Sequence, residues 1–443
     1  MRLLDQVRPK RLVGLSRVPV AAASKVSHYR ERIFKRSLVL HGLLREPYTT
    51  RDVKRPSIER ARAERAPTTD GARAWVEVDL GAIVRNASRI AERAGVPLLP
   101  MIKADAYGLG AVRIARALAT VLPWGYGVAT IQEGVELRAA GLTDRIVIFA
   151  TLLDEELAHA RAHGLTPALG RRESIDAWVR LGGGAWHLAI DTGMHRAGVA
   201  WDGVRALADV LRSAPPEGAF THYHSADRSS ASVAEQTRRF QRALECMPAR
   251  PAVLHAENSP AIERLRDRSP WTLVRPGVFL YGVESCQDDD GGVNSMSGDH
   301  ALRPEEVVAL RARVVEVRTV APGETVSYGG TYRALITRTI ATVAAGYADG
   351  YRRAFSNVGR AVMNGRRVPV AGIVTMDATM LDVTGVDCAV GDVATLLGRS
   401  PGGARAPAVI LSTAALEAQL SPYELLTGLH ARLPRVYGSL SPE

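Results

Sequence analysis

The chain has 443 residues, of which 46% are hydrophobic and 23% are charged, which is the composition of an ordinary globular protein. This length exceeds what one hydrophobic core serves and predicts two domains. Three widely spaced cysteines with no CxxC pair exclude a disulfide framework and a cysteine-rich zinc site, and we expect no metal. No apolar run reaches the roughly 18 residues of a membrane span. We therefore expect a cytoplasmic protein with no membrane partner.

The net charge of +11 is concentrated near the N-terminus. Residues 1–72 contain 17 Lys and Arg against 7 Asp and Glu, whereas the rest of the chain contains 40 against 39. We expect residues 1–72 to form a basic, disordered extension or to reflect a translation start placed too far upstream. A targeting segment is a weaker alternative, because Arg17 interrupts the apolar run "LVGLSRVPVAAA". An arm for nucleic acid or acidic membranes has no motif to support it.

From residue 73 onward, short apolar runs alternate with helical patterns. After an opening strand and helix, eight candidate strands follow, at 97–104, 124–130, 145–150, 165–170, 185–191, 218–226, 251–258 and 271–277. Eight β-then-α units over roughly 210 residues predict a (β/α)8 TIM barrel, which we assign to residues 73–305. A doubly wound open sheet is the alternative, although no G-x-G-x-x-G follows the first strands.

A second domain is predicted from residue 306 to residue 443. A polar stretch rich in Gly and Asp precedes it, and its apolar runs are shorter. The pair Asn364-Gly365 between two alternating runs predicts a β-hairpin, so we expect a smaller, mainly-β domain. In "SPYELLTGL", Ser421, Pro422 and Glu424 predict the start of a helix.

Lys103 ends the first of the eight strands, in "MIKADAYGLG". In a barrel, the ends of the strands carry the active site. Partial desolvation there lowers the pKa of an amine and makes it a nucleophile toward a carbonyl. A lone lysine at a strand end is more often simply solvated, so this position needs the support of other motifs.

Nine segments in the same order supply that support. They are "KADAYGLG", "IDTGMHRAG", "THYHSAD", "HAENSPA", "VRPGVFLYG", "VSYGGTY", "GYADGY", "MDATMLDVT" and "RLPRVY". Together they resemble the motifs of the alanine racemase family, whose members bind pyridoxal 5'-phosphate on a barrel followed by a β domain. The resemblance covers about residues 73–443, and nine collinear motifs make it specific.

The resemblance implies a role for individual residues. Lys103 matches the lysine that carries the cofactor covalently and acts as an acid/base on one face of the substrate, and Tyr328 matches the acid/base on the opposite face. The family takes that tyrosine from the partner subunit, so a homodimer acting on alanine is implied. The further residues implied to bind the cofactor are Tyr107, His222, Ser259, Arg275, Gly277, Val278 and Tyr437, and those implied to bind the substrate are Arg196, Met376 and Tyr347.

Arg275 also bears on the reaction type. In the family this arginine faces the pyridine nitrogen of the cofactor, and a guanidinium does not surrender its proton. The ring is then a weak electron sink, which favours reprotonation over transamination, whereas related barrel decarboxylases place an acidic residue there. The resemblance therefore implies the interconversion of L- and D-alanine that supplies D-alanine for peptidoglycan, and Arg275 agrees with racemisation.

Several positions depart from the family pattern. Ala189 stands where many members have a carbamylated lysine that orients the following arginine, so Arg196 needs another anion, such as chloride or a nearby acid, or is held more loosely. Ala378, His224 and Glu257 are also unusual and put strict preference for alanine in doubt. The alternatives are a racemase of the same fold with broader amino-acid specificity, a decarboxylase on the related scaffold, which Arg275 disfavours, and a non-catalytic protein that binds the cofactor.

Overall fold

The computed structural model describes residues 69, 71–265, 267–286, 302–402 and 405–438. Residues 65–443 form one compact unit. Most of the predicted basic extension, residues 1–68 and 70, lies outside the described residues, so its expected disorder stays a prediction. In the part of the chain that the structure describes, no helix is long and apolar enough to cross a membrane.

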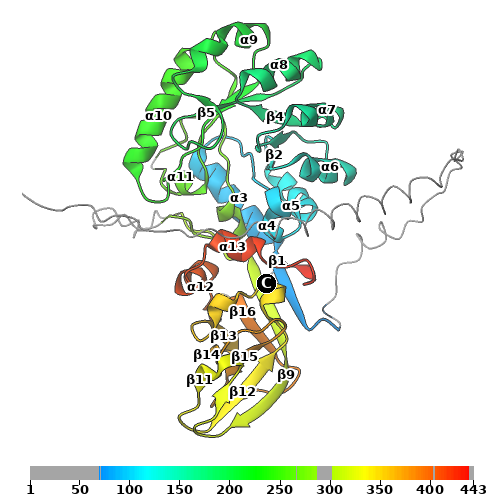
Figure 1. The fold of residues 1–443 in the computed structure, drawn as a ribbon, viewed down its shortest axis with the longest axis vertical. Coiled ribbons are helices and arrows are strands. Elements are labelled where there is room, and N and C mark those ends of the chain that lie inside the picture. Colours follow the sequence, from blue (N-terminus) through cyan, green and yellow to red (C-terminus); the bar gives the residue numbers. More distant parts are fainter. Residues whose placement is uncertain (1–68, 70, 266, 287–301, 403–404, 439–443) are drawn as a thin grey trace, which may run out of the picture. The chain divides into compact units, whose positions relative to one another are not determined.

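The N-terminal part is a closed barrel of parallel strands surrounded by helices (Figure 1). Single bridges join Leu98 to Val274, Met101 to Gly127 and His255 to Leu273, and so insert the segments around residues 98–101 and 273–274 between the first and last strands. All eight predicted strand segments therefore contribute to the barrel, and its closure excludes the open doubly wound sheet. The other strands, in their order around the barrel, are β2 (Tyr126–Val128), β3 (Ile146–Ile148), β4 (Thr166–Leu169), β5 (His187–Asp191), β7 (Gly218–Phe220) and β8 (Val253–His255).

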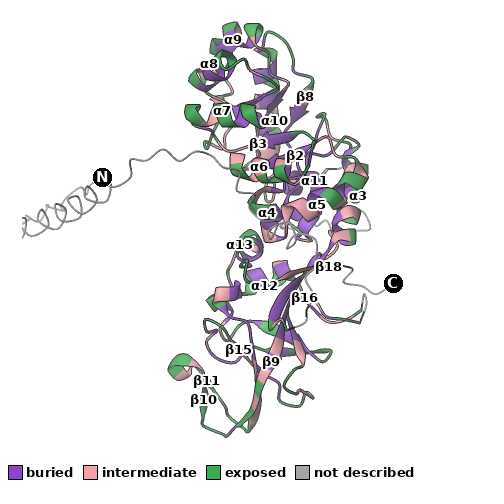
Figure 2. Cartoon of the chain, turned by 90° about the vertical axis from the view of Figure 1, so that its right-hand side faces the viewer, coloured by how far each residue is buried: buried purple, intermediate pink, exposed green. Residues whose placement is uncertain are grey.

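Several of the helices around the barrel are amphipathic. Helix α3 shows why: Ile83, Ala87, Ile90 and Ala94 recur every three or four residues and are buried, while its outer face is exposed (Figure 2). The remaining helices of this part are α4 (Lys103–Gly108), α5 (Ala111–Leu118), α6 (Ile131–Ala139), α7 (Asp154–Ala162), α8 (Arg172–Arg180), α9 (Ala208–Ser213), α10 (Ser230–Glu245) and α11 (Ser259–Glu263), and α3 itself spans Leu80–Ala94.

The C-terminal part is mainly β, as predicted. Its largest sheet runs in the order β14-β13-β16-β9-β1-β18, with β12 on β9, β15 on β12 and β17 on β16. The opening strand β1 (Ala74–Asp79) lies in this sheet and not in the barrel wall, between β9 and β18. The other strands are β9 (Val308–Val320), β10 (Thr325–Val326), β11 (Tyr332–Arg333), β12 (Arg338–Val343), β13 (Arg360–Met363), β14 (Arg366–Pro369), β15 (Thr379–Asp382), β16 (Val393–Arg399), β17 (Ala408–Val409) and β18 (Arg435–Gly438).

Two local predictions in this part can be compared with the structure. Strands β13 and β14 form the predicted hairpin, and Asn364 and Gly365 at its turn have φ of 44° and 74°, the left-handed geometry that a type I′ turn requires. The helix predicted after Ser421 is α13 (Pro422–Thr427), with proline in its first turn. Ser421 is its N-cap residue but makes no side-chain cap hydrogen bond. A further helix, α12 (Leu411–Glu417), precedes it.

Candidate active site

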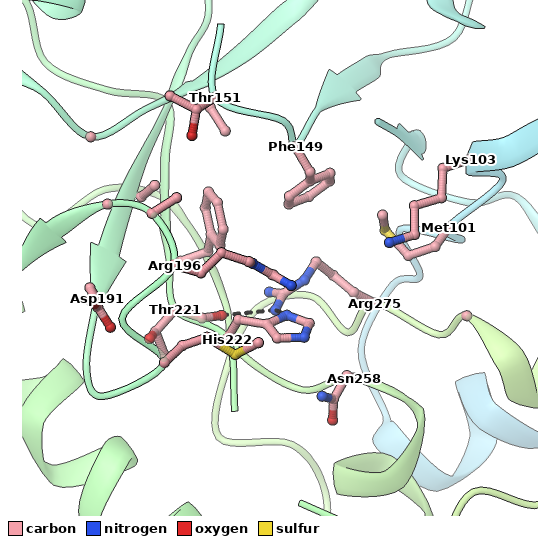
Figure 3. A pocket seen from close by; sticks show the side chains of 18 of the residues that line it. Met101, Lys103, Phe149, Thr151, Asp191, Arg196, Thr221, His222, Asn258 and Arg275 are labelled. Carbon is pink, nitrogen blue, oxygen red and sulfur yellow. Dashed lines mark hydrogen bonds between the residues drawn. The ribbon is translucent and has the colours of Figure 1, made fainter. Parts of the chain in front are cut away.

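A cavity of about 440 Å³ opens at the carboxyl ends of the barrel strands (Figure 3). Strands β4, β5 and β7, the loops after β3 and β8, and helix α13 all line it. This is the end of the barrel where side chains from different strands converge on one space. The predicted site residues that line the cavity are Lys103, Tyr107, Arg196, His222, Ser259, Arg275, Gly277 and Val278.

Lys103 begins an unusual backbone turn. The next four residues, 104–107, have φ between 52° and 57°, which is a left-handed helical conformation. For residues other than glycine this costs roughly 1–2 kcal/mol each. Two carboxylates hold the turn, because Glu133 accepts the N–H of Ala104 at 2.7 Å and Asp105 accepts that of Ala111 at 2.7 Å. Backbone strain of this kind is typical of functional sites, and here it fixes the base of the Lys103 side chain.

The environment of Lys103 favours its neutral amine. Burial lowers the pKa of the ammonium group most, the charges of Arg196 and Arg275 lower it further, and Glu133 opposes them. Figure 3 shows Lys103, Arg196 and Arg275 projecting into the same space. The lysine is therefore suited to act as a nucleophile or a base.

Arg275 is almost fully buried and has a fixed orientation. Its Nη2 donates to the carbonyl oxygens of Thr221 and Ala256, each at 2.8 Å, and its Nη1 contacts Nδ1 of His255 at 2.7 Å. Burial lowers its pKa to about 10, so the guanidinium stays charged at neutral pH. None of these partners is a carboxylate.

His222 contacts the same guanidinium, with its Nδ1 3.3 Å from Nη2 of Arg275. Burial, with the charges of Arg275, Arg196 and Lys103, lowers the pKa of His222 to about 3. The imidazole is therefore neutral at neutral pH. It presents a flat ring at the cavity wall beside the guanidinium (Figure 3).

Hydrogen-bonding groups of Tyr107, Ser259 and Gly277 also line the cavity. The Oγ of Ser259 accepts the N–H groups of Gly277 at 2.9 Å and Phe279 at 3.3 Å. A Cβ at Gly277 would lie 2.6 Å from the hydroxyl of Tyr107, so a larger residue at this position would displace that hydroxyl. Backbone N–H groups with serine and tyrosine hydroxyls are the donors that hold a phosphate.

Two tyrosines differ from the sequence analysis. Tyr423 lines the cavity although no motif pointed to it, and Tyr437 does not line the cavity although the resemblance implied that it binds the cofactor. Tyr423 lines the cavity, with its ring 6.3 Å from that of Tyr107. Tyr437, which the resemblance implied as a phosphate contact, donates its hydroxyl to the carbonyl of Leu109 at 3.0 Å and is not among the lining residues. The signal for Tyr423 was its place in the first turn of a predicted helix, which carries no chemistry by itself.

Three predicted residues lie away from the cavity of this chain. Tyr328, Met376 and Tyr347 are 73%, 54% and 39% exposed, and none of them lines it. Tyr328 begins a short 3-10 turn, η5 (Tyr328–Gly330), in the C-terminal part. Within one chain, therefore, the cavity has the amine and the donors but not the predicted phenol.

Ala189 and Arg196 both line the cavity. Arg196 has no hydrogen-bond or ion-pair partner among the residues that the structure describes, and its side chain is exposed to the cavity. A methyl group cannot supply the anion that the resemblance implies at this place. The guanidinium is therefore available to a ligand anion.

The sequence contains a further signal in its lysine content. There are five lysines, at positions 10, 25, 35, 54 and 103, so Lys103 is the last of them, and arginine supplies every other basic side chain from residue 55 to residue 443 except histidine. The one lysine of the two folded parts thus stands in the cavity. The barrel, this amine and the facing donors together define a protein that can bind a phosphorylated carbonyl compound covalently.

The comparisons with known proteins agree with this class. The model of the alanine racemase N-terminal domain matches residues 78–285, and that of the alanine racemase C-terminal domain matches residues 307–437. The chain belongs to the alanine racemase family.

Individual relatives match over nearly their whole length. An alanine racemase of Carboxydothermus hydrogenoformans is 36% identical over 378 residues, which are 82% of this chain and 99% of the relative. A crystal structure of alanine racemase from E. faecalis has a TM-score of 0.74 and 28% identity, covering 83% of this chain and 98% of that one. Another, from Bartonella henselae with covalently bound pyridoxal phosphate, has a TM-score of 0.72 and 27% identity, covering 83% and 100%.

Proposed function

We propose that this protein is an alanine racemase that binds pyridoxal 5'-phosphate and interconverts L- and D-alanine. The observation that carries the proposal is the meeting of Lys103, Arg275 and the donors around Ser259 in one cavity of the barrel. The relatives named above support the same activity and the same cofactor.

The residues present fit this cofactor. The Lys103 amine is suited to hold an aldehyde, and Gly277, Ser259, Tyr107 and Tyr423 supply the small side chain and the donors that a phosphate requires. When bound, the cofactor withdraws electrons from the Cα of the substrate and makes its proton acidic. The neutral ring of His222 is suited to pack against an aromatic cofactor, and Val278 borders the phosphate donors.

Lys103 and Tyr328 then divide the proton transfer. The amine of Lys103 removes or returns the Cα proton on one face, and the phenol of Tyr328 does so on the other, because inversion requires exchange from opposite faces. Arg275 keeps its charge and donates without giving up a proton, which favours return of the proton to Cα. Arg196, which lines the cavity, would bind the substrate carboxylate, and the backbone N–H of the partner subunit's Met376 would add a second donor.

We propose that the active form is a homodimer in which the partner subunit's Tyr328 completes the site. The supporting observation is that Tyr328, Met376 and Tyr347 are exposed and lie outside the cavity that holds Lys103. An exposed tyrosine, methionine and second tyrosine in one domain are typical of an interface. We further propose that the enzyme acts in the cytoplasm and supplies D-alanine for peptidoglycan.

Broader amino-acid specificity is the second candidate, and Ala189 favours it. The small side chain leaves space in a cavity of about 440 Å³ that also exposes the Arg196 guanidinium. A substrate with a longer side chain would use that space.

Proton–deuterium exchange at Cα tests these proposals together. The purified protein with pyridoxal phosphate is incubated in D2O with a panel of amino acids, and exchange and optical rotation are followed. We expect exchange and racemisation of alanine above all others. Fast exchange of larger amino acids would select the broader racemase, and yellow protein without exchange of any amino acid would select a non-catalytic binding protein.

A further inference from the structure

A chain of four polar side chains crosses the barrel interior below the candidate active site. Nη1 of Arg275 lies 2.7 Å from Nδ1 of His255, and Nε2 of His255 lies 2.8 Å from Nδ1 of His187. Nε2 of His187 then lies 3.7 Å from a carboxylate oxygen of Glu217. His187 begins β5 and Glu217 immediately precedes β7, so the chain leads from the cavity to the amino ends of the strands.

Arg275 and Glu217, at the two ends of this row of side chains, define the direction of the hydrogen bonds between them. A guanidinium only donates, so Nδ1 of His255 accepts and its proton is on Nε2. Nε2 of His255 then donates to Nδ1 of His187, whose proton is also on Nε2 and points to Glu217, which as a carboxylate only accepts. Each imidazole thus has one consistent tautomer: both nitrogens of His255 are hydrogen-bonded, and the Nε2–H of His187 faces the Glu217 carboxylate at 3.7 Å without a hydrogen bond.

Burial makes this arrangement consequential. Both imidazoles have no exposed surface, and burial lowers the pKa of each, so both stay neutral. The side chain of Glu217 is 28% exposed and is held by His187 and by Arg145, 3.7 Å away. The contact with His187 keeps the pKa of Glu217 below its ordinary value, so it is ionised at neutral pH. At 3.7 Å this contact is longer than a hydrogen bond and acts mainly by electrostatic attraction.

Arg275 needs such a distant partner, because the groups that contact it directly are carbonyls and imidazoles. The other carboxyl group near it is that of Glu257, which is buried, hydrogen-bonded to Ser269, and has its pKa raised to about 7 by burial. Around neutral pH that group is therefore only partly charged. Glu217 supplies a full negative charge at the far end of the row formed by Arg275, His255, His187 and Glu217.

We infer that Glu217 is a positioning residue of the active site, which acts through His187 and His255 to fix the tautomer and orientation opposite Arg275. The guanidinium is then held against rotation and its charge is balanced from the other end of the barrel. Carboxylate–histidine pairs orient metal ligands in the same way, and losing the outer partner there lowers activity about 10-fold or more. This inference rests on the proposed function for the part played by Arg275 in catalysis.

The test compares Glu217→Gln with Arg145→Gln. The second variant removes the exposed ion pair of Glu217 but keeps its contact with His187, so it controls for a merely structural role. Protein labelled with ¹⁵N in histidine is prepared without and with pyridoxal phosphate, and the imidazole nitrogens are observed by NMR. Signals of His187 and His255 are assigned with single His→Gln variants, and kcat and KM for alanine are measured for both test variants.

We expect both imidazoles of the unsubstituted chain to be neutral with the proton on Nε2 at neutral pH and above, facing the ionised Glu217 at one end and Arg275 at the other. Glu217→Gln should shift the signals of both rings and lower kcat roughly tenfold with KM little changed, and Glu217→Asp should restore most of kcat. Arg145→Gln should leave both sets of values near those of the unsubstituted chain.

A proton on Nδ1 of either ring, or equal effects of the two glutamine variants, would overturn the inference. If the Glu217→Gln protein does not fold, the NMR measurement of the His187 and His255 tautomers in the unsubstituted protein tests the inference by itself. The NMR measurement without pyridoxal phosphate needs no activity, so failure of this inference is distinguishable from failure of the proposed function.

Discussion

The barrel cavity and the turn that carries Tyr328 differ in how many contacts they make within one chain. In the cavity, Arg275 has four hydrogen-bonding contacts within the chain, and the left-handed turn after Lys103 is held by two carboxylates. Tyr328 is 73% exposed and stands apart from that cavity. The contrast between a cavity held by its own chain and an exposed phenol is what supports the proposal that the second acid/base comes from another subunit.

Removing the Lys103 amine should have the largest effect on activity. Lys103→Ala should lower the rate of alanine racemisation by at least about 1000-fold, because it removes both the covalent anchor and one acid/base. Racemisation is measured by the appearance of D-alanine from L-alanine. Borohydride reduction of the unsubstituted enzyme with pyridoxal phosphate should label Lys103, and labelling confined to the lysines at 10, 25, 35 or 54 would contradict the assignment.

Removing the phenol should disable the other side without touching cofactor binding. Tyr328→Phe should lower kcat about 100-fold or more, since one of the two proton transfers loses its acid/base. The affinity for pyridoxal phosphate, measured by absorbance titration, should change little, because Tyr328 does not line the cavity. An equal loss of cofactor binding would refute the division of roles between the two regions.

Solution pH should affect the cavity side through the Lys103 amine. Its pKa is lowered from the ordinary lysine value, and the neutral amine is the form present above that pKa. The rate at which the cofactor-free protein captures pyridoxal phosphate should therefore rise with pH and level off below pH 10.5, the ordinary value. Stopped-flow absorbance measures this, with a lysine peptide as reference. A midpoint equal to that of the peptide would argue against the desolvated site.

Chloride should have the smallest effect, and it acts on the exposed edge of the cavity. Because Arg196 has no partner among the described residues and Ala189 offers no charge, a small anion should bind there and orient the guanidinium. An exposed ion pair of this kind is worth about 0.5–1 kcal/mol, which corresponds to a roughly two- to fivefold gain in kcat/KM. Gluconate at equal ionic strength is the control. Equal kcat/KM in chloride and in gluconate would show that no anion bound at Arg196 assists the reaction.

The fold was largely predictable because its signals are local. Short-range patterns predict the eight strand segments, the Asn364-Gly365 hairpin and the change to shorter apolar runs near residue 306. The place of β1 was not predictable, because its partners β9 and β18 are more than 200 residues away and any strand can pair with either sheet. The sequence pattern alone gives each strand but not its neighbours.

The site was predictable where a residue stands in a motif and not where the contact is made by the fold. The motifs point to Lys103 and Arg275, and the structure brings them into one cavity. The left-handed turn at residues 104–107 gives no sequence signal, since alanine, aspartate and tyrosine all prefer negative φ. Tyr423 reaches the cavity only because α13 packs near Tyr107, a contact across some 300 residues of chain.

Subunit complementation tests the shared site most directly. Lys103→Ala and Tyr328→Phe proteins, each nearly inactive, are mixed, dissociated and allowed to reassociate, and racemisation is measured per mole of mixed dimer. Since one mixed dimer would join an intact lysine from one chain with an intact tyrosine from the other, we expect activity to return to about half that of the unsubstituted dimer. No recovery in a mixture shown by mass spectrometry to contain mixed dimers would contradict the account.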